Sequence, residues 1–328
     1  MATLLLAVLS FIGCENKDSS PAPVAETPVN QSMQPQTDLS QVCERVEQRM
    51  KEMNAQRTTL ALEQINKDIS ICLPNLETLS EKLALLELSN QMYRNFLKVE
   101  RTPEEQKHFE QYALERSQHP TIQESHLKQL SLRDQYLLKH QGQAYIDLYD
   151  DEQHRLTYRR HPSYLDVVFA PYLPAAEATF ISLLAEQNRN PIFNSHGLSL
   201  SATELVNRTL AWEKYLKQYP NSTFKQDAKT LYQQYQVYLF KGSQHDADAS
   251  LTHPKIETRE ALETLIQESN SNLSHKAQAY LKLIQNEDTN HQFDIETELN
   301  QILGFDTGKI PNRNCLIDAI CLKGKPFT

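Results

Sequence analysis

Apolar residues recur at intervals of three or four along most of the chain after residue 38, a spacing typical of amphipathic helices. The pattern predicts helices over residues 39–55, 58–72, 76–99, 102–117, 121–130, 132–141, 163–169, 175–187, 202–218, 223–240, 254–269, 274–286 and 293–303. Only 7 of the 328 residues are Gly, so tight turns and glycine-rich phosphate loops have few places to form. The sequence therefore predicts a mainly α-helical protein.

One stretch departs from the helical spacing. In residues 143–160, a polar turn at 150–154 follows Tyr145, Ile146, Leu148 and Tyr149, and Leu156 and Tyr158 come after it with alternation. This alternation predicts a small β-hairpin near 143–160, and residues 191–201 form either a second short hairpin or a plain loop. The predicted fold is a set of helical hairpins packed in a bundle or a solenoid-like array, with one small β-hairpin.

Several helix ends carry their own signals. The stretch 102–105, Thr-Pro-Glu-Glu, combines an N-cap, a proline at the first helical position and the glutamate of a capping box. Ser201 and Glu204 have the same spacing before the helix 202–218, and Gly242 is a suitable C-cap after residue 240. The polar stretch 244–254 predicts a boundary between a helical main domain, 39–243, and a C-terminal helical region with a cysteine-containing tail, 244–328.

The first 38 residues differ in composition from the rest of the chain. Residues 4–12 are an apolar run, shorter than the roughly 20 residues that span a bilayer but suited to the apolar part of an export signal. Residues 14–38 are rich in Pro, Ser, Thr and Gln and cannot bury a core, which predicts a disordered tether. Such a tether would reach about 25–30 Å on average.

The residues Phe11-Ile12-Gly13-Cys14 resemble the lipobox of bacterial lipoproteins, with Phe11 where Leu is usual. In that family the signal segment, here 1–13, is removed, and the cysteine is acylated, with palmitate among its chains, and becomes the first residue. The resemblance implies lipidation of Cys14. Glu15, rather than Asp, after the cysteine implies an outer-membrane protein whose body faces the periplasm.

The chain has five cysteines, an odd number. If Cys14 carries lipid, an even set remains for disulfides in an oxidising compartment: Cys43, Cys72, Cys315 and Cys321. A turn near 56–57 places Cys43 and Cys72 opposite each other at the open end of a helical hairpin, where a bridge closes a loop of about 30 residues. On one continuous helix Cys315 and Cys321 would lie about 10 Å apart, so a bridge between them requires a loop or a helix break. Three pairings stay open, as does a cytosolic protein with reduced thiols.

Aromatic residues gather in the helices 202–218 and 223–240. The helix pair around Trp212–Leu216 and Tyr219–Ser222 resembles the tetratricopeptide-type repeats of bacterial envelope proteins, which bind peptides in a concave groove. No second copy follows at a period of about 34 residues, which favours a single helical hairpin over an array. The aromatic side chains serve either as core packing, which their helical spacing favours, or as a partner-binding surface. The candidates for that surface are Trp212, Tyr215, Tyr219, Tyr232, Tyr235 and Tyr238.

Motifs for catalysis and metal binding are weak. Glu124-Ser125 matches two letters of the lytic transglycosylases without their glycine-rich continuation, and Asp306-Thr307-Gly308 matches three letters of the aspartic proteases without a second carboxylate motif. The eleven histidines form no i, i+4 pair and no Cys-x-x-Cys occurs, so no metal and no cofactor is predicted. The net charge of −9 argues against a nucleic-acid partner.

The stretch 39–242 also resembles bacterial envelope proteins to which no activity is attached. Together these observations predict a lipid-anchored envelope protein, with the membrane and another envelope protein as its partners. Its expected role is that of a non-catalytic accessory or scaffold. The alternative is a cell-envelope enzyme whose site is assembled from dispersed carboxylates and histidines.

Overall fold

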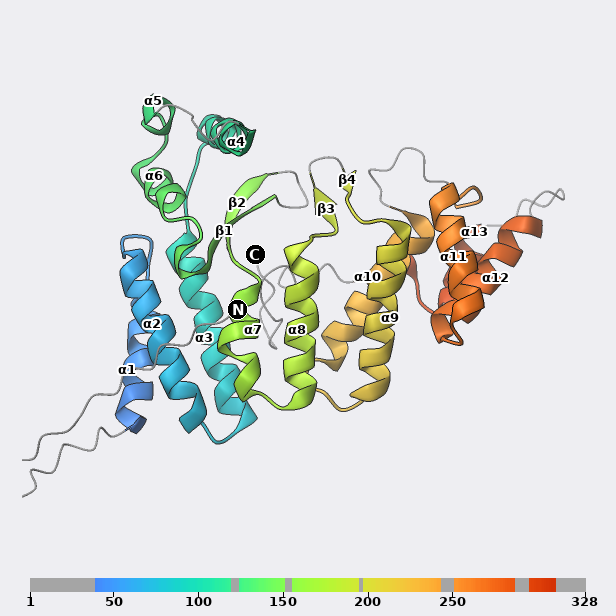
Figure 1. Ribbon diagram of the computed structural model, residues 1–328, viewed down its shortest axis with the longest axis horizontal. Helices are drawn as coiled ribbons and strands as arrows, with labels where there is room; N and C mark the ends of the chain where they lie inside the picture. The colour runs from blue at the N-terminus through green and yellow to red at the C-terminus, as the bar shows by residue number, and fades with distance from the viewer. Residues whose placement is uncertain are drawn as a thin grey trace, which may run out of the picture. The chain divides into compact units, whose positions relative to one another are not determined.

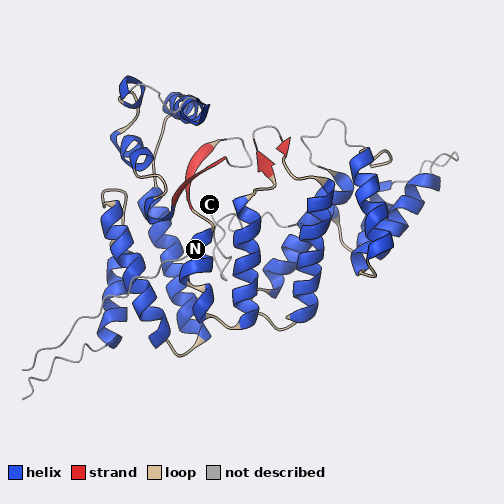
Figure 2. Ribbon diagram, viewed as in Figure 1, coloured by secondary structure: helices blue, strands red, loops and turns tan. Residues whose placement is uncertain are grey.

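The computed structural model describes residues 39–118, 124–150, 155–194, 197–242, 251–286 and 295–310. The chain divides into two units, Met1–Thr37 and Asp38–Thr328, and every described residue belongs to the second. Figure 2 shows that this unit is mainly helical with small antiparallel β-hairpins, which confirms the predicted fold class. The signal segment, Cys14, the tether, Cys315 and Cys321 lie outside the described residues.

The helices and strands follow one another along the chain as labelled in Figure 1. The helices are α1 (Leu39–Lys51), α2 (Thr59–Cys72), α3 (Leu79–Leu97), α4 (Pro103–Gln118), α5 (Glu124–Leu127), α6 (Leu132–Lys139), α7 (Ser163–Val168), α8 (Ala175–Arg189), α9 (Ala202–Gln218), α10 (Lys225–Lys241), α11 (Ile256–Glu268), α12 (Asn272–Asn286) and α13 (Ile295–Leu303). The strands are β1 (Ile146–Asp150), β2 (Leu156–Arg160), β3 (Phe193–Asn194) and β4 (Gly197–Leu198). Strand β1 pairs with β2, and β3 pairs with β4, both antiparallel, so residues 191–201 do contain a second short hairpin.

Several predicted helices are shorter than their hydrophobic pattern, and three of them differ most. Helix α1 ends at Lys51 rather than near residue 55, because Asn54 accepts from the N–H of Gln56 and begins a turn. Helix α3 begins at Leu79 rather than residue 76, because Thr78 and Glu81 form a reciprocal capping box. In the stretch predicted as a helix over 121–130, the described helix α5 is a single turn that ends at Leu127.

The helices pack mainly against their neighbours in the chain. Helix α1 packs on α2, α7 on α8, α9 on α10 and α11 on α12, as Figure 1 lets the reader follow. Helix α1 also contacts α3, and α11 and α12 both contact α9. Buried residues from α1 through α13 belong to one continuous hydrophobic core. The boundary at 244–254 stays a prediction.

A buried arginine attaches the larger hairpin to the helices. The side chain of Arg160, the last residue of β2, is 1 % exposed and donates to Asn90 Oδ1 at 2.8 Å and to Ser89 Oγ at 3.3 Å, both on α3. Its guanidinium lies 4.6 Å from the ring centre of Tyr164. Since a buried cation is costly without hydrogen bonds, these contacts fix the position of β2 on α3.

The turn before β1 has an unusual backbone. Ala144 and Tyr145 both have positive φ, 47° and 60°, and Gly142 has φ 86°. Hydrogen bonds hold this turn: the hydroxyl of Tyr93 donates to the carbonyl of Ala144 at 2.8 Å, and the N–H of His161 donates to the carbonyl of Tyr145 at 2.7 Å. Left-handed backbone at two consecutive non-glycine residues is strained and persists only where the surroundings determine it.

We expect Gly142→Ala to lower the free energy of unfolding by about 1 kcal/mol, because only glycine adopts positive φ without strain. The added Cβ would meet nothing within 4 Å, so the cost comes from the backbone and not from a clash. Urea unfolding followed by circular dichroism measures the change. Gly308→Ala is the matched control, since Gly308 does not have positive φ, and it should change stability little. Equal losses in the two variants would contradict this account.

Candidate functional site

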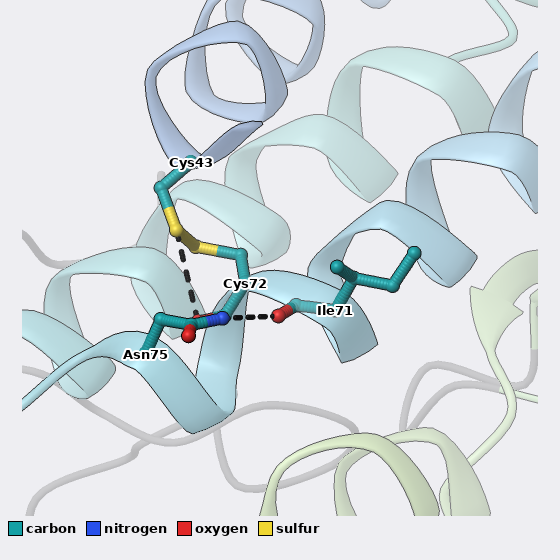
Figure 3. Close-up of a disulfide and its surroundings, with 4 residues drawn as sticks. All are labelled: Cys43, Ile71, Cys72 and Asn75. Carbon is teal, nitrogen blue, oxygen red and sulfur yellow. Dashed lines mark hydrogen bonds between the residues drawn. A yellow bond between two sulfur atoms is a disulfide. The ribbon is translucent and has the colours of Figure 1, made fainter. Parts of the chain in front are cut away.

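The first hairpin of helices is closed by a disulfide between Cys43 of α1 and Cys72 of α2. Their Cα atoms lie 5.1 Å apart, within the usual range for a bridge, and Figure 3 shows the bond. Just beyond the end of α2, Asn75 Nδ2 donates to the carbonyl of Ile71 at 2.8 Å. The 3.7 Å approach of Cys43 Sγ to the Cys72 carbonyl is a van der Waals contact, because a bridged sulfur has no proton to donate. The Cys43–Cys72 prediction is confirmed.

Aromatic residues of α8, of α9 and of the N-cap of α10 form the largest aromatic cluster of the described core. Phe180 of α8 lies at its centre, with ring-centre distances of 4.8 Å to Phe224, 5.3 Å to Trp212 and 5.8 Å to Tyr215. The indole N–H of Trp212 donates to the buried Oε1 of Gln187 at 2.8 Å. Burial raises the pKa of Tyr215 to about 12, so its hydroxyl stays protonated. These side chains join α8, α9 and α10 into one packed block.

Tyr232 of α10 hydrogen-bonds to a carboxylate within the protein. The hydroxyl of Tyr232 donates to Glu213 Oε2 at 3.0 Å, and the N–H groups of Asn272 and Leu273 donate to the same carboxylate at 2.8 and 2.9 Å. Burial, and then the charge of Glu213, raise the pKa of Tyr232 well above its ordinary value. Glu213 thus caps the N-terminus of α12 and links it to α9 and α10.

The structure corrects the partner-binding candidates. Trp212, Tyr215 and Tyr235 are 0–2 % exposed, so they cannot form a surface and are core residues, as their helical spacing favoured. Tyr219, Tyr232 and Tyr238 are half-buried and pack against the same core. Burial therefore excludes three of the six candidates from a binding face, and the role of Tyr219, Tyr232 and Tyr238 stays a prediction.

An open groove lies on a different face of α9, between α9 and α11. It has a volume of about 520 Å³ and is lined by residues of 201–210 and 257–269. Its floor is apolar, with Val206 and Leu265 buried and Leu210 and Ala261 half-buried. Its rim carries exposed glutamates along α11: Glu257, Glu260 and Glu268.

This groove was not predicted from the sequence. The signal that could have found it is the presence of apolar residues on two faces of α9, at Leu205 and Trp212 on one side and at Ala202, Val206 and Leu210 on the other. A helix with two apolar faces needs two partners. Helix α10 covers the first face, and α11 covers the second only in part, since the groove remains open.

A second hollow, lined mostly by residues with polar side chains, lies beside the strained turn. It has a volume of about 660 Å³, and Tyr145, Asp147, His161 and Ser163 line it. Asp147 pairs with Arg159 at 3.0 Å, and His161 Nδ1 accepts from the N–H of Ser163 at 3.2 Å. The carboxylate is thus engaged by an arginine, and the Nδ1 atom of the imidazole by a backbone N–H.

Within the described ranges, no group of three or more His, Cys, Asp or Glu side chains is placed to hold a metal ion. Among the described helices, none has both the length and the apolar character needed to cross a bilayer. The two weak catalytic matches fall in short helical turns. Glu124-Ser125 lies in the one-turn helix α5, and Asp306-Thr307-Gly308 forms the N-cap and first residues of a 3₁₀ turn, Thr307–Lys309. Asp306 there pairs with Lys309 at 2.8 Å and accepts from the N–H of Gly308 at 3.0 Å, as a turn residue does.

Comparison with known proteins finds no matching family model, no matching curated protein and no matching solved structure.

Proposed function

We propose that this chain is a lipid-anchored protein of the bacterial outer membrane that serves as a non-catalytic accessory or scaffold for another envelope protein. The observation that carries the proposal is the disulfide between Cys43 and Cys72. Disulfides persist in oxidising compartments and are rare in the cytosol, so the bridge supports export. The lipobox-like residues ending at Cys14, and Glu15 after them, support the anchor and the membrane.

The scaffold role is supported by how the side chains are used. The polar groups at the centre of the helical block, such as Glu213 and Gln187, cap helices or bind core residues. The groove between α9 and α11 combines an apolar floor with a charged rim, the composition of surfaces that bind proteins. A binding role therefore accounts for the features of the described part of the chain.

The competing function is an envelope enzyme, and the polar hollow beside Tyr145 is the place that favours it. Strained backbone often accompanies functional sites, and the hollow holds both His161 and Asp147. Against catalysis stands the engagement of Asp147 by Arg159. The two functions make opposite predictions for His161→Ala: unchanged growth and envelope integrity under the scaffold role, and a loss equal to that of the deletion under the enzyme role.

Intact mass spectrometry of the native protein extracted from membranes tests the anchor. We expect a triacylated chain that begins at Cys14, with Cys43 and Cys72 alkylated only after reduction. Cys14→Ser should abolish the acyl mass and release the protein from the membrane fraction, because the lipid chains provide the membrane affinity. A chain of unmodified mass that retains Met1 and carries five free thiols would refute both export and anchoring.

A further inference from the structure

The groove between α9 and α11 has the shape of a docking site for one helix. Its lining residues follow helical spacing on both sides, at 203, 206, 207 and 210 of α9 and at 257, 260, 261, 264, 265 and 268 of α11. The two lined stretches rise about 11 Å and about 17 Å along their helix axes, the length of two to three helical turns. A segment of about 7–11 residues would therefore fill the groove.

The two helices that form the groove run in the same direction. Ala202 and Glu257, each in the first turn of its helix, both line the groove at one end. Toward the other end, Asn272, which follows α11 closely, donates its N–H to Glu213 in the second half of α9. Two parallel helices with a gap between them leave a position for a third helix, the arrangement in which proteins commonly bind amphipathic helices.

The negative charge on the rim favours a positively charged partner. Glu257, Glu260 and Glu268 are exposed, and within the described ranges none of them forms an ion pair, whereas Glu263 on the outer side of α11 pairs with Arg259. Among the described residues that line the groove there is no Lys, Arg or His. A partner segment that offers apolar residues to the floor and Lys or Arg to the rim complements both.

The helix dipole of α11 makes the negative potential differ between the two ends of the groove. Glu257 lies in the first turn, where the positive end of the dipole offsets its charge, and Glu268 is the last residue, where the negative end adds to it. The negative potential therefore increases along the groove toward Glu268. The positive N-terminus of a partner helix fits best at that end, antiparallel to α9 and α11.

We propose that this groove binds a basic amphipathic helix of a partner protein. The inference rests on the proposed scaffold function and deepens it, because it names the surface and the chemistry of the partner. Binding in this groove requires neither the membrane anchor nor the polar hollow beside Tyr145. A test in solution with the purified full chain therefore separates its failure from the failure of the anchoring proposal.

The test uses two synthetic helical peptides of about 18 residues, long enough to be partly helical when free. Both have blocked ends and Leu at i, i+3, i+4 and i+7, and they differ only in carrying Lys or Glu at the other positions. Fluorescence anisotropy measures their binding to the full chain. We expect the Lys peptide to bind, the Glu peptide not to bind, and the affinity to fall as salt is raised.

Two variants locate the binding site. Glu260→Lys combined with Glu268→Lys should weaken binding of the Lys peptide about tenfold or more, since two attractive pairs become repulsive. The matched control is Glu263→Lys on the outer side of the same helix, combined with Glu298→Lys on α13, which gives the same change in net charge away from the groove. Circular dichroism and urea unfolding establish that the variants remain folded. Leu210→Asp, which places a charge on the floor, should also weaken binding.

Three results would overturn the inference. One is equal weakening by the groove pair and the control pair, which would mean non-specific attraction to an acidic protein. Another is equal binding of the Lys and Glu peptides. The third is cross-linking of a photo-reactive group at position 207 to residues 311–328 of the same chain or to a second copy. The natural occupant of the groove would then not be a partner protein.

Discussion

Replacing Asp134 with Ala is expected to lower the free energy of unfolding by about 3–5 kcal/mol, because it leaves a buried arginine without its counter-charge. Asp134 of α6 and Arg101, just before α4, have side chains that are 3 % and 6 % exposed. The guanidinium donates from Nε to both carboxylate oxygens, at 3.0 and 3.2 Å, and its Cζ lies 3.7 Å from the ring centre of Phe109. Urea unfolding of the variant measures the loss.

The carboxylate of Asp134 has further partners that should make the loss large. Ser131 Oγ donates to it at 2.8 Å, and the hydroxyl of Tyr158 on β2 lies 3.2 Å from Oδ1. Burial, and then the charge of Asp134, raise the pKa of Tyr158 well above its ordinary value, so the hydroxyl remains a donor. The carboxylate thus joins α6, the start of α4 and the larger hairpin.

A double-mutant cycle tests whether the pair is the cause. Arg101→Ala together with Asp134→Ala should cost less than the sum of the single losses, since the double variant leaves no buried charge unpaired. The exposed pair Lys98–Glu100, 2.7 Å apart, is the control, and Glu100→Ala should leave stability nearly unchanged. Additive losses at Arg101 and Asp134 would show that packing, and not the ion pair, carries the effect.

The helices could be predicted from sequence because their signals are local. Helix α9 begins and ends where predicted, at Ala202 and Gln218, and Ser201 caps it by accepting from the N–H of Glu204 at 3.2 Å. Only half of its capping box forms, because Glu204 binds Arg208 at 2.7 Å. At the end of α10, Gly242 has φ 73° and donates its N–H to the carbonyl of Tyr238, as expected for a C-cap.

The tertiary contacts could not be predicted in the same way. Arg160 looks like an exposed strand residue in the sequence, and its burial depends on Ser89 and Asn90, about 70 positions earlier in the chain. Ala144 has no local reason for positive φ, since the hydroxyl that fixes its carbonyl belongs to Tyr93 on α3. Both features arise from contacts between segments far apart in sequence.

The candidate site was missed for a related reason. The aromatic residues placed the predicted binding surface on the face of α9 that carries Trp212, yet that face is covered by α8 and α10. The open face carries small and aliphatic residues, Ala202, Val206 and Leu210, which alone resemble ordinary core positions. Only the incomplete cover by α11, with Glu260 and Glu268 at its edge, turns that face into a groove.

Removing the disulfide by Cys43→Ala together with Cys72→Ala is expected to lower the free energy of unfolding by about 3–4 kcal/mol, the chain-entropy value for a loop of this length. The bridge joins residues 29 positions apart and ties α1 to α2 at the open end of their hairpin. Without it, α1 is held by its apolar face, with Val46 and Met50 at 1 % exposure, and by the ion pair between Arg49 and Asp68. We therefore expect its amide protons to lose more protection from exchange than those of α9.

A reductant tests whether the Cys43–Cys72 bridge is the only disulfide that stabilises the protein. Adding dithiothreitol to the natural chain should lower its stability by about the same 3–4 kcal/mol, and adding it to the double variant should have no effect. If the reductant also destabilises the double variant, a second bridge contributes, and Cys315→Ala with Cys321→Ala would identify it. If the reductant changes neither chain, the Cys43–Cys72 bond is absent from the protein in solution, and the main support for an exported protein is lost.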